Sequence, residues 1–186
     1  ATFAALSDGT MIANPRPMKT ARIAVERAQR KVSRRKRGSK RRGKARLLLA
    51  KRHAHVANVR RDFHHKTARA IVQKYDRIAV EDLNVKGLAR GMLAKSVHDA
   101  GWSQFVGFLA SKAEEAGREL VRVDPNGTSQ ECSACGERVP KALGVRVHRC
   151  LCGYTADRDV NAARNIHDRA IAVTRPGCGL RGGAAA

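Results

Sequence analysis

The chain has 186 residues, 42% of them hydrophobic, which is enough for one ordinary domain with a small insertion and excludes a wholly disordered protein. Its 38 lysines and arginines against 16 acidic residues give a formal net charge of +22, which favours a polyanionic partner. No apolar run approaches the ~20 residues of a membrane span. Four of the five cysteines are closely paired and Cys178 is left over, which suits a reducing compartment better than a disulfide framework, so we expect a cytoplasmic protein.

The first predicted element is an antiparallel β-hairpin. Two β-prone runs, 2–7 and 10–12, flank Asp8 and Gly9, a dipeptide that accepts the positive φ of a tight turn. Because the chain starts at Ala1, already inside the first run, we expect it to be the remainder of a longer protein.

A helical hairpin is predicted next, over residues 18–75. Gly38 and Ser39 separate a first helix from a second one over about 42–73, and each helix carries an apolar stripe by which the two can pack. The stripe residues are Met18, Ala21, Val25, Ala28 and Val32 in the first helix, and Leu49, Val56, Val59, Phe63 and Ala70 in the second.

Positive charge is concentrated in this hairpin. Between Lys19 and Arg61 there are 18 lysines or arginines and one acid, Glu26, whereas a solvated helix face usually carries both signs. The predicted nucleic-acid-binding residues crowd around the hairpin tip: Lys31, Arg34, Arg35, Lys36, Arg37, Lys40, Arg41, Arg42, Lys44 and Arg46. Since only 4% of residues are aromatic, we expect contacts with the phosphate backbone rather than base stacking.

Four histidines of the second helix could suggest a metal site: His53, His55, His64 and His65. The only neighbouring pair is adjacent in sequence, and adjacent helical positions do not face a common point. We therefore interpret these histidines as residues of the polar face, near the phosphates.

Strands and helices alternate in the rest of the chain. The predicted elements are a strand over 77–80, a loop over 87–91, a helix over 97–116 that ends at Gly117, a strand over 119–124 and a helix over 160–171. Trp102, Phe105 and Leu109 lie on one face of the middle helix and are assigned to the core. This order indicates a mixed α/β domain into which a metal-binding knuckle is inserted near the end.

The knuckle is defined by two cysteine pairs, Cys132-x2-Cys135 and Cys150-x-Cys152. Four thiolates on two neighbouring turns can close a tetrahedral zinc site, and a glycine follows each pair. Only one residue separates the second pair, where two are commoner, so His148 is an alternative ligand if that turn is strained. The competing interpretation is a set of reduced cysteines without metal. A closed site of this kind would be structural.

Carboxylates at two positions suit a harder cation. Glu81 ends a strand and Asp159 follows the knuckle, and hydrolysis of a phosphodiester with two divalent ions needs acids from distant parts of the chain. Taken singly, Asp157 and Asp159 could be helix N-caps and Glu81 a solvated strand end. Asp82 would point to the opposite face of an extended segment, so Glu81 is preferred as a ligand.

Four ordered blocks resemble the C-terminal half of the TnpB (OrfB) proteins of insertion sequences. They are residues 80–87 (VEDLNVKG), residues 96–102 (SVHDAGW), the paired cysteines and residues 157–166 (DRDVNAARNI), and the match extends to about Arg169. That family comprises transposase-associated, RNA-guided DNA endonucleases related to the type V CRISPR effectors. The resemblance implies a RuvC-like nuclease domain of RNase H fold with an inserted zinc ribbon.

The resemblance also implies roles for individual residues. Glu81 would be the second catalytic acid and Asp159 the third, together holding magnesium or manganese, with Asp157 and Asn161 as supporting residues. The family's first catalytic aspartate would precede Ala1, and a turn residue such as Asp8 does not replace it. We therefore expect this chain alone to retain fold and binding better than cleavage.

The implied domains are a RuvC-like first part over 1–124 that contains the basic helical hairpin, a zinc ribbon over 125–155, a RuvC-like final part over 156–172 and a flexible tail over 173–186. The implied partners are DNA and a guide RNA, without membrane or small-molecule substrate, in a prokaryotic, nucleoid-associated protein. The alternative is a non-catalytic, basic zinc-ribbon protein that binds RNA or DNA.

Overall fold

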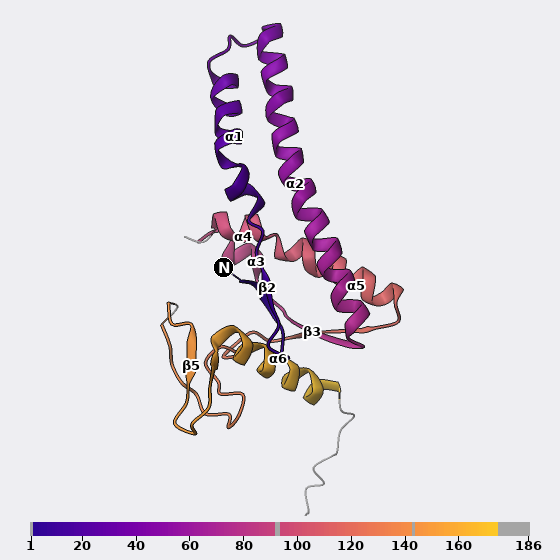
Figure 1. The fold of residues 1–186 in the computed structure, drawn as a ribbon, viewed down its shortest axis with the longest axis vertical. Coiled ribbons are helices and arrows are strands. Elements are labelled where there is room, and N and C mark those ends of the chain that lie inside the picture. The colour runs from indigo at the N-terminus through magenta and orange to yellow at the C-terminus, as the bar shows by residue number, and fades with distance from the viewer. Residues whose placement is uncertain (1, 92–93, 143, 175–186) are drawn as a thin grey trace, which may run out of the picture. The chain divides into compact units, whose positions relative to one another are not determined.

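A computed structural model describes residues 2–91, 94–142 and 144–174 (Figure 1). The chain forms two compact units: one combines residues 13–76 with 84–119, and the other combines residues 2–12 and 77–83 with the chain from Leu120 onward. Most of the predicted tail, including Cys178, lies outside the described residues. No helix in the described ranges is both long and apolar enough to cross a membrane.

The first unit contains the expected helical hairpin, α1 (Pro17–Ser33) and α2 (Lys40–Lys74), whose helices lie side by side (Figure 1). Ser39 begins α2, because its side chain accepts a hydrogen bond from the Arg42 N–H at 3.2 Å. Val25 and Ala28 of the predicted α1 stripe are buried.

The predicted stripe of α2 is only partly right. Val56 is buried, but Val59 is 37% exposed and Ala70 is exposed. The side chains buried along the second half of the helix are His64, Ala68, Ile71 and Val72. This 35-residue helix packs on both α1 and α5 (Trp102–Glu115), so different parts of its buried face contact different helices.

The region predicted as one helix over 97–116 is two helices, α4 (Ala94–Ala100) and α5 (Trp102–Glu115). Gly101 separates them with φ 65, and a Cβ there would lie 2.9 Å from Arg60 Cδ. The predicted end of α5 is confirmed, since Gly117 has φ 63 and the Arg118 N–H bonds the Ala113 carbonyl at 2.7 Å.

Two further predictions for this unit have mixed outcomes. Phe105 and Leu109 are buried as expected, whereas Trp102 is half-buried. The predicted loop over 87–91 begins inside a short helix, α3 (Val85–Leu88), because the Asn84 side chain accepts a hydrogen bond from the Gly87 N–H at 3.0 Å and caps it.

Asp99 joins three helices of the first unit. Its carboxylate accepts hydrogen bonds from the backbone N–H groups of Met18 at 2.9 Å and Lys19 at 3.3 Å, at the start of α1, where no residue of α1 itself supplies a side-chain cap. Arg60 of α2 donates to the Asp99 carbonyl at 2.8 Å and pairs with its carboxylate at 3.5 Å. The SVHDAGW block thus holds α1, α2 and α4 together.

The second unit contains short strand pairs and one long helix. The hairpin of β1 (Thr2–Ala5) and β2 (Met11–Ala13) turns at Gly9, as predicted, and its short connection requires antiparallel strands. The strands β3 (Arg77–Glu81) and β4 (Glu119–Val123) pair with each other, and hydrogen bonds join Asp76 with Glu119 and Asp82 with Val123, so the two strands run in parallel.

The knuckle and the last helix complete this unit. The strands β5 (Val147–Arg149) and β6 (Thr155–Asp157) are antiparallel, with Val147 opposite Asp157. The helix α6 (Arg158–Thr174) follows β6 directly and contacts β1, β3, β5 and β6. Within the unit, α6 is therefore the element against which the strands and the knuckle are positioned.

Candidate metal centres and nucleic-acid surface

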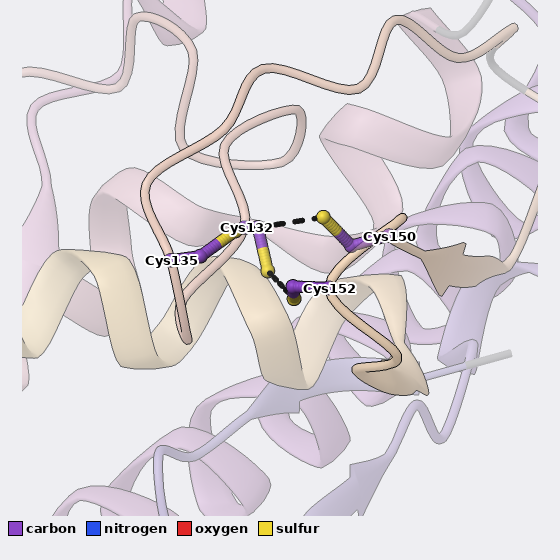
Figure 2. A group of neighbouring side chains, drawn as sticks. All are labelled: Cys132, Cys135, Cys150 and Cys152. Atoms are coloured by element: carbon purple, nitrogen blue, oxygen red, sulfur yellow. Dashed lines mark hydrogen bonds between the residues drawn. The ribbon is translucent and has the colours of Figure 1, made fainter.

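The four paired cysteines converge from two loops (Figure 2). The Sγ atoms of Cys132 and Cys152 are 3.8 Å apart, those of Cys135 and Cys150 are 3.5 Å apart, and all four lie within 4.8 Å of one another. A tetrahedral ion with ~2.3 Å bonds to sulfur places its ligands ~3.8 Å from one another, so this group fits such an ion. His148 is not in the converging group; it is fully buried, with Nδ1 bonded to the Lys141 ammonium.

Tight turns shape each half of the cluster. The Gly136 N–H bonds the Cys132 carbonyl at 2.8 Å, and the Gly153 N–H bonds the Cys150 carbonyl at 3.1 Å. Both glycines have positive φ, 79 and 86, where other residues are strained. The glycine that follows each cysteine pair in the sequence therefore permits the tight turn at that pair.

The pKa values of the two thiols in the first pair are shifted in opposite directions. Burial of Cys132 acts to raise its pKa, but the backbone N–H groups of Ala134 and Cys135 stabilise the thiolate and lower the pKa to about 6. The Glu137 N–H acts to lower the pKa of Cys135, yet hydrogen bonds among the clustered sulfurs raise it to about 12. Soft sulfur ligands this close together repel one another when ionised, and a bound cation would offset that repulsion, so the cluster has the chemistry of a metal site.

Two buried asparagines of α6 hold the backbone that leads into the first cysteine pair. Asn161 is fully buried; its Oδ1 accepts a hydrogen bond from the Ser133 N–H at 3.0 Å, and its Nδ2 donates to the Glu131 carbonyl at 2.7 Å. Asn165 donates from Nδ2 to the carbonyls of Thr128 and Glu131, both at 2.8 Å. The residue predicted as supporting, Asn161, thus fixes the knuckle on α6.

Glu81 lies at the end of β3 and is half-buried. Its Oε1 accepts a hydrogen bond of 2.8 Å from the Thr128 hydroxyl. The neighbouring Asp82 instead pairs with Arg122 at 3.1 Å and is 64% exposed. The two acids therefore have different surroundings: Glu81 is half-buried and bonds a hydroxyl, whereas Asp82 is exposed and pairs with a cation.

The acids near the start of α6 have separate partners. Asp157 Oδ1 accepts hydrogen bonds from the N–H groups of Asp159 at 2.8 Å and Val160 at 3.4 Å, so it acts as a helix cap. The Asp159 carboxylate, 36% exposed, faces Arg158 at 3.3 Å and Arg146 at 3.7 Å. Asp159 lies on the first turn of α6 and Glu81 at the end of β3, two elements in contact within the second unit.

The basic tip of the helical hairpin is open to solvent. Of the ten residues named as nucleic-acid contacts, nine are exposed and Arg42 is half-buried, bonding the Arg35 carbonyl at 3.1 Å. The acid of α1, Glu26, pairs with Arg22 and Arg30 of the same helix, on the stem side of the tip. In residues 31–46, all of them described, no cation has a carboxylate partner within 4 Å.

The prediction for the histidines is wrong for His64. Its side chain is fully buried, its Nε2 lies 2.9 Å from the Ala100 carbonyl, and its ring packs edge-on against Phe105. Burial, with a further contribution from Arg60, lowers the pKa of His64 below its ordinary value. His65 is half-buried and its ring stacks on Phe108 at 4.0 Å between centroids.

Sequence reasoning missed three polar residues that organise the two units: Thr128, Asn165 and Asp99. Each is a small polar side chain that hydrogen-bonds backbone or side-chain groups far away in sequence. Hydrophobic periodicity does not predict such contacts. A signal existed for two of them, since Asp99 and Asn165 lie inside the blocks that carry the family resemblance.

Comparison with known proteins supports that resemblance at the level of domains. Residues 1–92 match the family described as probable transposase (OrfB_IS605), and residues 102–166 match the Cas12f1-like TNB domain. The second match includes the four cysteines, Asp159 and Asn161.

Two curated relatives are similar in sequence over nearly the whole chain. A putative RNA-guided DNA endonuclease of Streptomyces pristinaespiralis is 40% identical over 95% of this chain and 44% of its own length. The putative RNA-guided DNA endonuclease InsQ of Escherichia coli is 32% identical over 89% of this chain and 46% of its own length. The chain therefore spans less than half the length of each of these two relatives.

A solved structure shares the fold. Cas12f1, in the cryo-EM structure of its complex with sgRNA and target DNA, aligns with a TM-score of 0.57 and 17% identity over 84% of this chain and 43% of that chain. The mixed α/β architecture expected from the sequence is thus that of a known fold. The chain belongs to the TnpB (OrfB) transposase family.

Proposed function

We propose that this chain is the C-terminal, RuvC-like portion of an RNA-guided DNA endonuclease, built on an RNase H fold. The observation that carries the proposal is the placement of Glu81 at the end of β3 and Asp159 on the first turn of α6, two elements that pack together in one unit. The relatives named as putative RNA-guided endonucleases support it. Residues 1–124 and 156–172 would form the nuclease domain and residues 125–155 the zinc ribbon.

Glu81 and Asp159 would bind magnesium or manganese through their carboxylates. Divalent ions bound there would supply an activated water and stabilise the leaving oxygen of a DNA phosphodiester. Asp157 supports the site by fixing the first turn of α6, and Asn161 supports it by fixing the knuckle against the same helix. The intact enzyme would need a further acid besides these two.

The cysteine cluster would hold a structural zinc ion. Its four sulfurs leave no open position for substrate, so the ion would stabilise the knuckle rather than react. Zinc is favoured over harder ions because all four ligands are soft sulfurs.

The exposed basic tip would bind the phosphates of DNA or guide RNA. Ten cations lie close together without carboxylates, and their mutual repulsion is relieved when phosphates neutralise them. If about five phosphates are neutralised, log Kd should change with log salt with a slope of about 4 to 5. An affinity that is equal at low and moderate salt would contradict this role.

A second candidate is a non-catalytic, basic zinc-ribbon protein that binds nucleic acid. It is favoured by one observation, namely that the Asp159 carboxylate is already neutralised by Arg158 and Arg146. In that case the charge of Asp159 would serve the fold rather than a cation.

Cleavage of DNA by the protein expressed from its complete reading frame, with its guide RNA and magnesium, separates the two candidates. The nuclease proposal expects Glu81→Gln and Asp159→Asn to lose activity by about 100-fold or more. Asp82→Asn is the matched control, because Asp82 is exposed and pairs with Arg122. Equal cleavage by all four proteins would refute the catalytic assignment, and binding without cleavage would favour the second candidate.

A further inference from the structure

The environment of Glu81 contains a group that neither the sequence motifs nor the proposed chemistry assign. Thr128 lies in the turn between β4 and the first cysteine pair, and its side chain is 3% exposed. Its hydroxyl is 2.8 Å from Glu81 Oε1 and 3.0 Å from the Pro125 carbonyl. A buried hydroxyl is therefore directed at the carboxylate of a candidate metal ligand.

The chemistry of this contact makes Glu81 the preferred acceptor of the Thr128 proton. A hydroxyl has one proton, and a carboxylate is a stronger acceptor than a neutral carbonyl, so the proton goes to Glu81 when that residue is charged. Two carboxylate oxygens offer about four lone-pair directions, and the Thr128 bond uses one. The remaining directions stay available to a cation.

The backbone of Thr128 is itself held by α6. Asn165 donates to the Thr128 carbonyl at 2.8 Å, and the same amide group bonds the Glu131 carbonyl. Arg169, one turn further along α6, bonds the Asp124 carbonyl at 2.8 Å and the Glu131 carboxylate at 2.7 Å. Three segments of the turn are thereby fixed to the helix whose first turn carries Asp159.

We propose that Thr128 is a positioning residue for Glu81. Through α6, Asn165 and Thr128 hold the Glu81 carboxylate in a fixed position relative to Asp159. The proposal rests on the proposed function of Glu81 as a cation ligand. A free glutamate side chain loses rotamer freedom when it is immobilised, and that loss opposes cation binding. The Thr128 bond restricts that freedom before a cation arrives, so the cation binds more tightly.

A purely structural role of the same hydroxyl has a different signature. The bond to the Pro125 carbonyl could simply close the turn, in which case loss of the hydroxyl would lower stability and leave cation affinity unchanged. Cation affinity measured next to stability therefore separates positioning from turn closure.

The experiment compares the Mn²⁺ dissociation constants of the zinc-loaded chain and its variants, measured from the electron paramagnetic resonance signal of free Mn²⁺. Thr128→Val keeps the shape of the side chain and removes the hydroxyl, and Thr128→Ser keeps the hydroxyl. We expect about tenfold weaker Mn²⁺ binding for the valine variant, equal to ~1.4 kcal/mol, and affinity close to wild type for the serine variant. Where valine is not accommodated, Thr128→Ala against Thr128→Ser gives the same comparison.

A double-mutant cycle with Glu81→Gln separates failure of the inference from failure of the proposed function. We expect the Thr128→Val effect to vanish when Glu81 is replaced, because the two residues act through one bond. Unchanged Mn²⁺ affinity in Glu81→Gln would refute the proposed role of Glu81. Weaker binding in Glu81→Gln together with wild-type affinity in Thr128→Val, or full additivity of the two changes, would overturn the positioning role alone.

Discussion

Replacement of Asp99 by alanine should destabilise the helical unit by about 2 to 3 kcal/mol. The Asp99 carboxylate caps α1 through the N–H groups of Met18 and Lys19, and a lost helix cap costs ~1 kcal/mol. It also pairs with Arg60 in a site where the two side chains are only 21% and 11% exposed. Breaking a buried pair costs ~3–5 kcal/mol, but Arg60 keeps its bond to the Asp99 carbonyl, so we assign ~1 to 2 kcal/mol to this contact.

Urea unfolding followed by far-ultraviolet circular dichroism measures this loss, since the long helices dominate the signal. Asp99→Asn retains one acceptor oxygen and should lose roughly half as much. Asp62→Ala is the control: Asp62 also pairs with a cation, Lys66 at 2.8 Å, but at 62% exposure, so ~0.5 kcal/mol or less is expected. A loss below ~0.5 kcal/mol for Asp99→Ala would refute the view that the SVHDAGW block joins the helices.

Three further predictions follow from the same structure. Burial lowers the folded-state pKa of His64 below its unfolded value near 6.5, so the contribution of neutral His64 to stability is complete above pH ~6.5 and declines as the pH falls, by up to ~1.4 kcal/mol per pH unit. The unfolding free energies at pH 7.5 and pH 5.5 should therefore differ less in His64→Gln than in wild type. An equal difference in the two proteins would contradict this prediction. Gly101→Ala should cost more than Gly117→Ala in the same urea assay, because both glycines have positive φ but only at Gly101 would a Cβ approach Arg60 Cδ to 2.9 Å; equal losses would show that backbone strain alone matters. The purified chain should contain about one zinc ion, measured by mass spectrometry of the metal. The Cys135→Ser variant should lose its zinc to a chelator more readily than wild type. A zinc content well below one ion per chain would refute the structural site.

Local chemistry made much of the fold predictable. The hairpin turn at Gly9, the helix break at Gly38 and Ser39 and the stop at Gly117 each follow from residues that permit or stabilise one backbone conformation, and the structure confirms them. The convergence of the four cysteines was equally predictable, because metal-ligand spacing brings side chains together almost regardless of the surrounding fold.

Tertiary context explains the misses. A helix over 97–116 looks continuous in sequence, but Gly101 takes a positive φ between α4 and α5, and Arg60 and His64 of α2 leave little room for a Cβ there. His64 looked polar because a single sequence does not reveal that α4 supplies the Ala100 carbonyl and α5 supplies an aromatic partner, Phe105. Glu81 and Asp159 were chosen by motif, and their relation depends on α6, Thr128 and Asn165, which no local pattern specifies.

The position of a bound cation tests the central claim most directly. Crystals of the zinc-loaded protein soaked in Mn²⁺ would reveal it by anomalous diffraction at the manganese edge. We predict a Mn²⁺ ion with an oxygen of Glu81 and an oxygen of Asp159 both within ~2.5 Å. A cation bound elsewhere, or Asp159 still paired with Arg158 and Arg146 at saturating Mn²⁺, would contradict the shared site.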